Sequence, residues 1–349
     1  MAADQLTQTR SAKLDHVRAP PANRLPAHPA SWYLFCHAGE IREKPFSKPF
    51  LGRRLVSYRT AEGQAVVLDG RCSHLGTDLG LGQVVGNAIQ CPFHHWEYAP
   101  DGRCTRIPAQ SDIPPFARQV CFPTVERHGF VFIFNGPKPL FPLPFFGDEL
   151  PEEFEPAKPF SAALECPWYM VGAHTFDRHH LWATHDRRLT GAPFVECPSP
   201  FSRRATATFG VVGTTLRDRL TRRFAGDEVT LATTDWCGTL ILTTATFRRT
   251  TGYGMVAATP QETGGVRVEV VPFVKRSGSR LGRMLFDPVN ASVRRYFIKK
   301  FVSDDFVRLS TVRYNPHALI GSDQDMIEYF HWLTMVAHGG SPESKKEES

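Results

Sequence analysis

The sequence predicts an α+β protein of two domains: an all-β domain, then a domain with one curved antiparallel sheet covered by helices, a helix-grip-like arrangement. Three observations support this. The chain has 349 residues, enough for two hydrophobic cores. Short strands broken by Gly, Pro and Asp fill residues 30–142, whereas long Thr- and Val-rich strands fill residues 203–274. Segments of helical length without internal breaks flank the long strands.

Composition sets the expected domain boundaries. Residues 1–29 are polar and rich in Pro and Ala, and residues 341–349 are highly charged, so both are predicted to be mobile or disordered tails. The proline-rich, aromatic segment 143–159 is predicted to connect an N-terminal domain, 30–142, to a C-terminal domain, 160–340. No apolar run is long enough to span a membrane, and no secretion signal is recognisable, which leaves peripheral membrane contact open.

Cysteine usage and charge limit the class of protein. The eight cysteines follow no regular framework, which favours free thiols in a reducing cytoplasm over disulfides. The formal net charge is +6, and the arginines crowd into short stretches. A solvated basic surface is the simplest explanation, and a docking site for an acidic electron-transfer protein is the next. Nucleic-acid binding ranks last, because no nucleic-acid-binding motif accompanies the charge.

Two cysteine–histidine pairs stand in loops of the first domain. One residue separates Cys72 from His74, two separate Cys91 from His94, and sixteen lie between the pairs. One Cys and one His on each of two loops is the pattern of a Rieske [2Fe–2S] centre, in which two cysteines hold one iron and two histidines hold the other. A zinc site is the alternative, although structural zinc sites more often use two Cys-x-x-Cys pairs.

The residues around these pairs extend the pattern to Arg71-Cys72-x-His74, Cys91-Pro92-Phe93-His94-x-Trp96 and Asp101-Gly102. The pattern resembles the Rieske domain of the Rieske non-haem iron oxygenases. One departure is His95, where that family commonly has glycine. Either His94 or His95 could then be the second histidine ligand, and the two-residue gap after Cys91 favours His94. We assign no role to His95.

A second set of candidate metal ligands lies in residues 168–188, whose length and composition predict a helix. Asp177 is followed by His180 three residues later and by His185 five residues after that. Two histidines and a distant carboxylate can form the facial triad that holds mononuclear iron(II) and leaves coordination positions open. Ordinary core or surface histidines are the alternative interpretation.

Two histidines five residues apart converge only if the helix bends or ends between them, and Thr184 is the candidate position. His174 and His179 do not fit the spacing, and we assign them no role.

The spacing of the aspartate and the two histidines resembles the catalytic signature of the Rieske oxygenases. The resemblance implies that a downstream helix supplies the carboxylate ligand, and residues 301–309 fit this description. We assign the ligand to Asp305, with Asp304 as the alternative. Asp323 and Asp325 rank lower, because they fall in a following loop.

The resemblance also implies a mechanism. The cluster receives electrons one at a time from a ferredoxin or flavin-containing reductase and passes them to the iron, which activates O2 beside the substrate. A separate reductase is expected, because the sequence has no NAD or flavin fingerprint. In this family a ring-shaped homotrimer places the cluster of one subunit near the iron of its neighbour. The bridging aspartate of that arrangement corresponds to Asp177, between His180 and His94, with His74 as the alternative to His94.

Substrate and reaction are less defined by the sequence. We expect an α-only monooxygenase, because the chain lacks the extra length of the large ring-dihydroxylating subunits. Arg313-Tyr314 and Trp332 resemble the tail of the ketosteroid hydroxylase and sterol desaturase branch, which implies a sterol or another bulky apolar substrate. Hydroxylation, desaturation, demethylation and oxidative cyclisation stay open, as does an aromatic or natural-product substrate.

Three rival functions remain. The first is a Rieske electron carrier without catalysis, and the second is a zinc- or nucleic-acid-binding regulator. The third is a degenerate oxygenase kept as a scaffold, against which the intact ligands at both sites argue.

Overall fold

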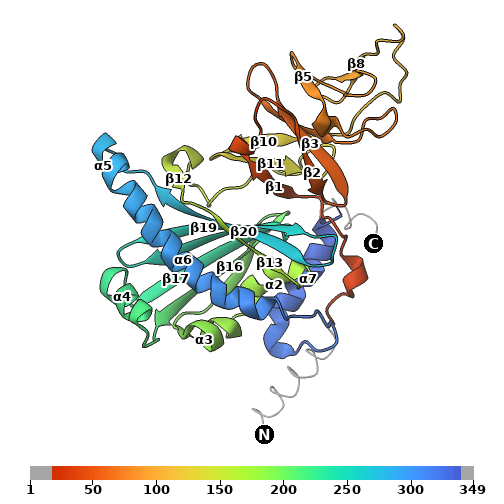
Figure 1. Cartoon of the computed structure of the whole chain (residues 1–349). Coiled ribbons are helices and arrows are strands. Elements are labelled where there is room, and N and C mark those ends of the chain that lie inside the picture. Colours follow the sequence, from red (N-terminus) through yellow and green to blue (C-terminus); the bar gives the residue numbers. More distant parts are fainter. Residues whose placement is uncertain (1–17, 339–349) are drawn as a thin grey trace. The chain divides into compact units, whose positions relative to one another are not determined.

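The structure, a computed structural model, describes residues 18–338. Its contacts divide the chain into two compact units (Figure 1). The N-terminal unit comprises Ala30–Leu143 together with Gln261–Thr263. The C-terminal unit comprises Pro144–Pro260, the described residues from Gly264 onward and those before Ala30.

Three small antiparallel sheets form most of the N-terminal unit. The first has the order β1 (Trp32–His37), β11 (Phe130–Phe134) and β10 (Thr124–Arg127). The second has the order β2 (Phe46–Phe50), β3 (Arg53–Arg59), β4 (Ala65–Asp69) and β9 (Cys121–Phe122). The third has the order β5 (Gln83–Val85), β6 (Ala88–Gln90), β7 (Glu97–Tyr98) and β8 (Cys104–Arg106).

The strands are short because turn residues interrupt them. Gly102, in the turn between β7 and β8, has φ +84°, and a Cβ there would lie 2.2 Å from the Gln119 carbonyl oxygen, so only glycine fits. Two hydrophobic clusters fill the unit. One gathers around Tyr33 and Leu55, and the other around Tyr58 and Leu68. The second hydrophobic cluster includes both predicted cysteine ligands, Cys72 and Cys91. The two loops that carry the predicted iron–sulfur ligands are therefore built on a packed core.

A nine-stranded antiparallel sheet dominates the C-terminal unit. Its main order is β12–β20–β19–β18–β17–β16–β14, while β13 pairs with β20 and β15 with β16. The strands are β12 (Phe154–Pro156), β13 (Phe160–Leu164), β14 (Arg187–Leu189), β15 (Phe194–Ser199), β16 (Ser202–Val211), β17 (Glu228–Trp236), β18 (Leu240–Phe247), β19 (Thr251–Pro260) and β20 (Val266–Lys275). The alternating Thr and Val residues of β16–β20 therefore form the single antiparallel sheet that the sequence predicts.

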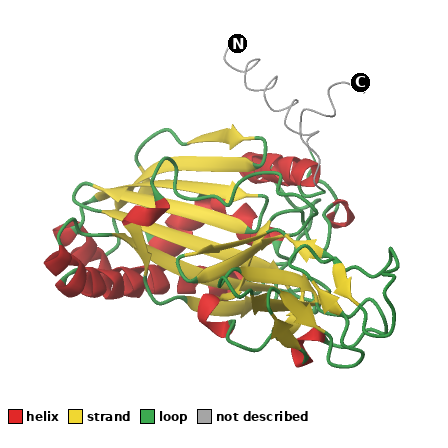
Figure 2. Ribbon diagram, turned by 90° about the horizontal axis from the view of Figure 1, so that it is seen from above, coloured by secondary structure: helices red, strands yellow, loops and turns green. Residues whose placement is uncertain are grey.

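Helices pack against this sheet. They are α2 (Tyr169–Ala173), α3 (His179–His185), α4 (Leu216–Phe224), α5 (Arg280–Leu285), α6 (Asp287–Leu309) and α7 (Gln324–Val336). Short 3-10 turns are η1 (Ala22–Arg24), η2 (Ala38–Glu40), η3 (Leu79–Leu81), η4 (Pro151–Glu153), η5 (His174–Phe176) and η6 (Gly321–Asp323). The long helix α6 packs on β20 and β13 and crosses the sheet in Figure 1. Figure 2 shows the helices, in red, beside the strands of the sheet, in yellow.

The predicted helix over residues 168–188 is wrong as a continuous element. The chain forms α2 and η5, becomes extended at Asp177 (φ −86°, ψ 98°), and only then forms α3. The Asp177 side chain accepts hydrogen bonds from the N–H groups of His179 and His180, so it caps a new helix instead of continuing the old one. Thr184 lies inside α3, and the irregularity expected there is absent from this described segment.

The N-terminal tail is also shorter than predicted. Residues 18–29 pack onto the C-terminal unit: Ala19 and Leu25 are buried, and the Tyr314 hydroxyl donates to the Pro20 carbonyl at 2.5 Å. The Trp168 indole N–H donates to the Pro26 carbonyl at 3.2 Å. The rest of the predicted tails, residues 1–17 and 341–349, lies outside the described residues. None of the described helices combines the length and apolarity needed to cross a membrane.

Candidate metal centres

Two loops of the N-terminal unit carry the predicted cluster ligands, and their backbones close in the same way. In the loop after β4, the Cys72 N–H donates to the Thr77 carbonyl at 2.9 Å, and the Gly76 N–H donates back to the Cys72 carbonyl at 2.8 Å. In the loop after β6, Cys91 N–H donates to the Trp96 carbonyl at 2.8 Å, and the N–H of the fourth residue on donates back to Cys91 at 3.1 Å. Each loop therefore holds one thiol and one imidazole in a tight turn.

The four side chains sort into a buried pair and an exposed pair. Cys72 and Cys91 are 4% and 1% exposed, whereas His74 and His94 are exposed, with ring centroids 4.6 Å apart. The His74 ring stacks on Trp96, with a centroid distance of 4.5 Å and an interplanar angle of 3°. Two inner thiols and two outer imidazoles fit a cluster with one cysteine-bound iron and one histidine-bound iron.

A buried tyrosine lies next to the inner thiols. The Tyr98 hydroxyl is 3.0 Å from Cys72 Sγ and 3.0 Å from Ser73 Oγ. Burial raises the pKa of Tyr98, so the phenol keeps its proton and can donate to a thiolate. Burial also raises the pKa of the Cys72 thiol, so metal binding here must displace a proton.

His95 lies in the left-handed backbone region. Its φ is 57°, and it occupies the turn position that Gly76, with φ 75°, occupies in the other loop. It is the His94 ring that faces His74. This geometry favours His94 over His95 as the second histidine of the set.

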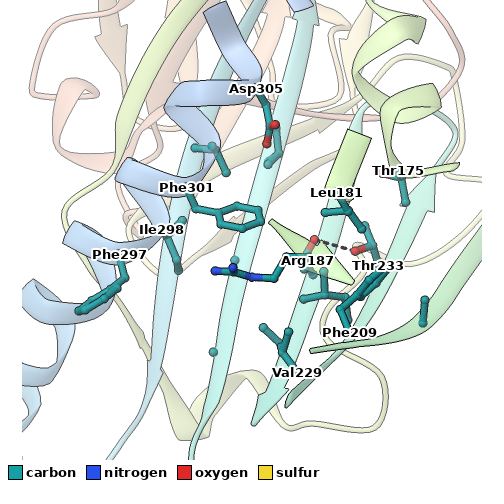
Figure 3. A pocket seen from close by; sticks show the side chains of 18 of the residues that line it. Thr175, Leu181, Arg187, Phe209, Val229, Thr233, Phe297, Ile298, Phe301 and Asp305 are labelled. Atoms are coloured by element: carbon teal, nitrogen blue, oxygen red, sulfur yellow. Dashed lines mark hydrogen bonds between the residues drawn. The ribbon is translucent and has the colours of Figure 1, made fainter. Parts of the chain in front are cut away.

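The second candidate centre lies in the C-terminal unit, where α3 meets α6. The ligand atoms of His180, His185 and Asp305 all lie within 4.8 Å of one another. His185 and Asp305 are buried, and His185 Nε2 is 2.7 Å from Asp305 Oδ1. Phe301, one turn before Asp305 on α6, stacks on the His185 ring with a centroid distance of 3.8 Å and an angle of 12°. Figure 3 shows Phe301 and Asp305 projecting from the same helix.

The charge states of these residues suit metal binding. Burial, together with the charge of His174, lowers the pKa of His180 to about 4, so its imidazole is neutral at pH 7. Burial would raise the pKa of Asp305, but the nearby imidazoles of His174 and His185 outweigh it and hold that pKa well below its usual range. His180 Nδ1 faces the Asp177 carbonyl oxygen, which leaves Nε2 for a metal. Two imidazoles and one carboxylate fit a mononuclear iron(II) ion.

The other predicted carboxylates point elsewhere. Asp304 is 42% exposed and its Oδ2 lies 3.8 Å from Arg217 Nη1. Asp325 forms an ion pair with Arg178. Asp177 Oδ1 accepts from the backbone of α3, at 3.0 and 3.3 Å, as described for its cap.

One residue at this centre was missed by the sequence interpretation. The His174 ring stacks on His180, with centroids 3.7 Å apart, and its Nε2 lies 3.5 Å from Asp305 Oδ1. Its ligand atom also lies within 4.8 Å of those of Asp177 and His180. The spacing of residues could not identify His174, because its ring meets His180 only where the extended backbone at Asp177 separates η5 from α3.

A cavity of about 750 Å³ opens beside this centre, and His180 and Asp305 line it. Most of its walls are apolar side chains and threonines from the sheet and from α6, including Phe209, Val229, Leu231, Phe297, Ile298, Thr233 and Thr243 (Figure 3). Four arginines also line it: Arg178, Arg187, Arg217 and Arg294. This volume falls within the range of about 300–1,000 Å³ that is typical of small-molecule sites. The arrangement can place an apolar molecule next to a metal-bound position.

Comparison with known proteins agrees with the first centre. Residues 31–117 match the family model of the Rieske [2Fe-2S] domain. Aminopyrrolnitrin oxygenase of Pseudomonas fluorescens is 43% identical over 123 residues, covering 33% of this chain and 34% of that protein. The oxygenase component of a 3-ketosteroid-9-alpha-monooxygenase of Rhodococcus rhodochrous is 39% identical over 101 residues, 29% of this chain and 26% of that protein. A cholesterol 7-desaturase of Xenopus laevis is 36% identical over 148 residues, 40% and 32%.

The matched stretches span about a third or less of each of these relatives. Solved structures extend the likeness in fold alone. Dicamba monooxygenase bound to dicamba superposes with a TM-score of 0.64 over 89% of this chain and 98% of that chain, at 16% identity. The family match confirms the predicted Rieske domain and its [2Fe–2S] cluster, and the shared architecture confirms the predicted fold class.

Proposed function

From its Rieske [2Fe–2S] domain and its architecture, which is that of the Rieske oxygenases, we propose that this chain is the oxygenase component of a Rieske oxygenase system. It uses O2 and electrons from a separate reductase to oxidise a bulky hydrophobic substrate, most simply as a monooxygenase. The observation that carries the proposal is the triad of His180, His185 and Asp305 beside an apolar cavity. A plain electron carrier has no use for such a centre.

Each group of residues has a distinct task. Cys72, His74, Cys91 and His94 hold the cluster. His180, His185 and Asp305 hold a mononuclear iron(II), which supplies the position at which O2 is activated. The three ligands come from two helices, α3 and α6, and two of them, His180 and Asp305, line the cavity, so a substrate in it would lie beside the metal. The apolar side chains of the walls would set which carbon of the substrate faces the metal.

Electron supply defines the partner. A ferredoxin or a flavin-containing reductase delivers electrons one at a time to the cluster, near the exposed His74 and His94. The relative that is named as the oxygenase component of a 3-ketosteroid-9-alpha-monooxygenase supports a multicomponent system.

A sterol or steroid is the proposed substrate class. The support is the size and apolar lining of the cavity, with threonines as its commonest polar groups, and the two relatives named for a ketosteroid and for cholesterol. The likeness to aminopyrrolnitrin oxygenase supports an aromatic natural product as the second candidate.

The function is tested by metal content and oxygen uptake. The wild-type protein should contain the cluster iron and one further iron per chain. We expect His185→Ala and Asp305→Ala to lose that further iron and all substrate-stimulated O2 uptake while keeping the red-brown cluster spectrum. Asp304→Ala, a change at the neighbouring carboxylate, should keep both. Uptake is measured with a generic ferredoxin and reductase across steroid, aromatic and fatty substrates. A wild-type protein with cluster iron alone would leave the electron carrier as the function.

Asp177 is proposed to link a cluster histidine, His94 or else His74, of one subunit to His180 of its neighbour in a homotrimer. The His180 backbone N–H donates to Asp177 Oδ1, and His180 Nδ1 faces the Asp177 carbonyl oxygen, which supports a position on this route. We expect Asp177→Asn, which keeps a capping oxygen, to retain both metals and to lose turnover by about 10–100-fold, as is usual for residues that orient metal ligands. Single-turnover electron transfer from the reduced cluster is the measurement. Normal product formation in this variant would exclude the role.

A further inference from the structure

The cavity reaches the surface at exposed apolar side chains. Four large apolar residues both line it and are exposed: Phe194 (51%), Leu220 (38%), Phe224 (68%) and Val293 (50%). They belong to β15, α4 and the N-terminal half of α6. The mouth of the cavity therefore lies between α4 and the start of α6.

The apolar surface continues beyond the mouth. Along α5, the residue that joins it to α6 and the first turn of α6, large apolar side chains follow one another and are at least half exposed: Leu281 (61%), Met284 (68%), Leu285 (51%), Phe286 (68%) and Val289 (62%). Leu216, at the start of α4, is 66% exposed. In Figure 1, α4 and α5 lie toward the same edge of the C-terminal unit. Scattered exposed apolar residues are ordinary, but a gathered set around a cavity mouth indicates an interaction site.

Arginines accompany this apolar surface. The exposed ones are Arg219 and Arg223 on α4, Arg248 and Arg249 in the turn between β18 and β19, and Arg280 and Arg283 on α5. The turn belongs to the mouth, because Arg249 Nη1 donates to the Arg223 carbonyl at 3.0 Å. Within residues 18–338 none of the six forms an ion pair with a carboxylate. Asp227 and Glu228, which follow α4, leave the surface strongly positive.

We propose that the surface formed by α4, α5 and the start of α6 docks on an anionic lipid membrane, so that an apolar substrate enters the cavity directly from the bilayer. Phe, Leu and Met side chains beside arginines are the composition of interfacial helices, whose apolar face enters the headgroup boundary while the basic residues bind anionic headgroups. The inference goes beyond the oxygenase function. Vesicle binding needs neither reductase nor iron, so it can fail or succeed independently of catalysis.

Two other occupants fit this surface less well. An acidic redox protein would complement the arginines, but it would not account for the large apolar side chains exposed on α4 and α5. A second copy of the chain would bring the same six unpaired arginines and so repel electrostatically.

Co-sedimentation of the full-length, cluster-loaded protein with vesicles tests the proposal. We expect binding to phosphatidylcholine vesicles that contain phosphatidylserine, little binding to phosphatidylcholine alone, and a loss of binding as NaCl rises. Phe224→Glu with Phe286→Glu should weaken binding by about tenfold or more, since each places a carboxylate where an apolar ring meets the headgroups. Arg219→Glu with Arg280→Glu should weaken it as strongly and remove most of the salt dependence.

Phe116→Glu is the matched control. Phe116 is 65% exposed and belongs to the N-terminal unit, which contributes no residue to the proposed surface. It should bind vesicles as the wild type does. Circular dichroism and the cluster spectrum establish that each variant is folded. Equal binding to both vesicle types, or none, would overturn the proposal. The proposal would also be overturned if the wild type did not bind vesicles and the Phe224/Phe286 double variant had a lower mass by light scattering than the wild type. That result would make the surface a contact between copies of the chain.

Discussion

His95 shows how a single residue can depart from a motif without breaking it. The two cluster loops close with the same pair of hydrogen bonds, and the fourth residue after the cysteine takes a positive φ in both: 75° at Gly76 and 57° at His95. An L-residue there brings its Cβ too close to the backbone, at a cost of about 1–2 kcal/mol, which glycine avoids. The chain tolerates this strain because the loop is fixed from both ends.

His95→Gly is therefore expected to stabilise the cluster-loaded N-terminal unit by about 1 kcal/mol and to leave the cluster spectrum unchanged. His95→Ala removes the imidazole but keeps the Cβ, so it should give no such gain. Denaturant unfolding followed at the cluster absorbance measures both. Equal stability of the two variants would mean that the imidazole, and not the backbone conformation, determines the effect.

At the residue scale, the sequence was sufficient where spacing is dictated by the metal. Cys72 and His94 follow a pattern that a [2Fe–2S] cluster requires, and the family match bears out the domain. The sequence was insufficient for a residue that packs on a predicted ligand only because the helix is interrupted. His174 lies against His180 only because Asp177 ends one helix and caps the next. Capping depends on which backbone N–H groups a side chain meets, and helix length and periodicity do not encode that.

Helix α4 is attached to the second candidate metal centre by a buried ion pair. Arg187, on β14, donates from Nη1 to the His185 carbonyl at 2.8 Å, and its Nη2 lies 3.0 Å from Asp218 Oδ1 on α4. Asp218 and Arg187 are 1% and 6% exposed. Burial would raise the pKa of Asp218, but the hydrogen bond from Thr215 and the charge of Arg187 outweigh it and lower that pKa, so the pair is ionised.

Breaking this pair from one side should be costly. We expect Arg187→Met or Asp218→Asn to destabilise the C-terminal unit by about 3–5 kcal/mol, because each leaves a charged or polar partner buried without its counterpart. The double variant should recover part of the loss, and urea unfolding of all three gives the coupling energy. Glu328→Gln is the control: its bond to Arg203 is 2.7 Å but Glu328 is 47% exposed, so the cost should stay below about 1 kcal/mol. Additive single losses would exclude the coupling.

At the scale of elements, the strands were easier to predict than the helices. The Thr- and Val-rich alternation of β16–β20 reports a half-buried sheet directly, and the structure has that sheet. Helical structure was predicted in the right part of the chain, residues 168–188, but as one helix instead of α2, η5 and α3. No Pro or Gly stands where the helix is interrupted, so the composition gave no sign of it. That α4 and α6 together frame a cavity mouth was outside the reach of the sequence, since it depends on packing between segments far apart in the chain.

The whole molecule consists of two units with separate cores, and this organisation has a thermodynamic consequence. The N-terminal unit packs Cys72 and Cys91 into one of its two hydrophobic clusters. The [2Fe–2S] cluster is therefore expected to stabilise this unit, because it binds the folded loops and not the unfolded chain. The C-terminal unit has its own core, including Phe209, Val211 and Val229, and its own cavity.

We accordingly expect two thermal transitions that respond to different ligands. Removing the cluster, or changing Cys72 to Ser, should lower the first by ten degrees or more, since about 1 kcal/mol shifts the midpoint of a small domain by about 4–8 °C. It should move the second by no more than a few degrees. An apolar substrate should raise only the second, because its cavity lies in the C-terminal unit. Calorimetry with cluster absorbance assigns the transitions, and Cys197→Ser, at an exposed cysteine, should change neither. One cooperative transition that moves with both ligands would mean that the two units unfold as one.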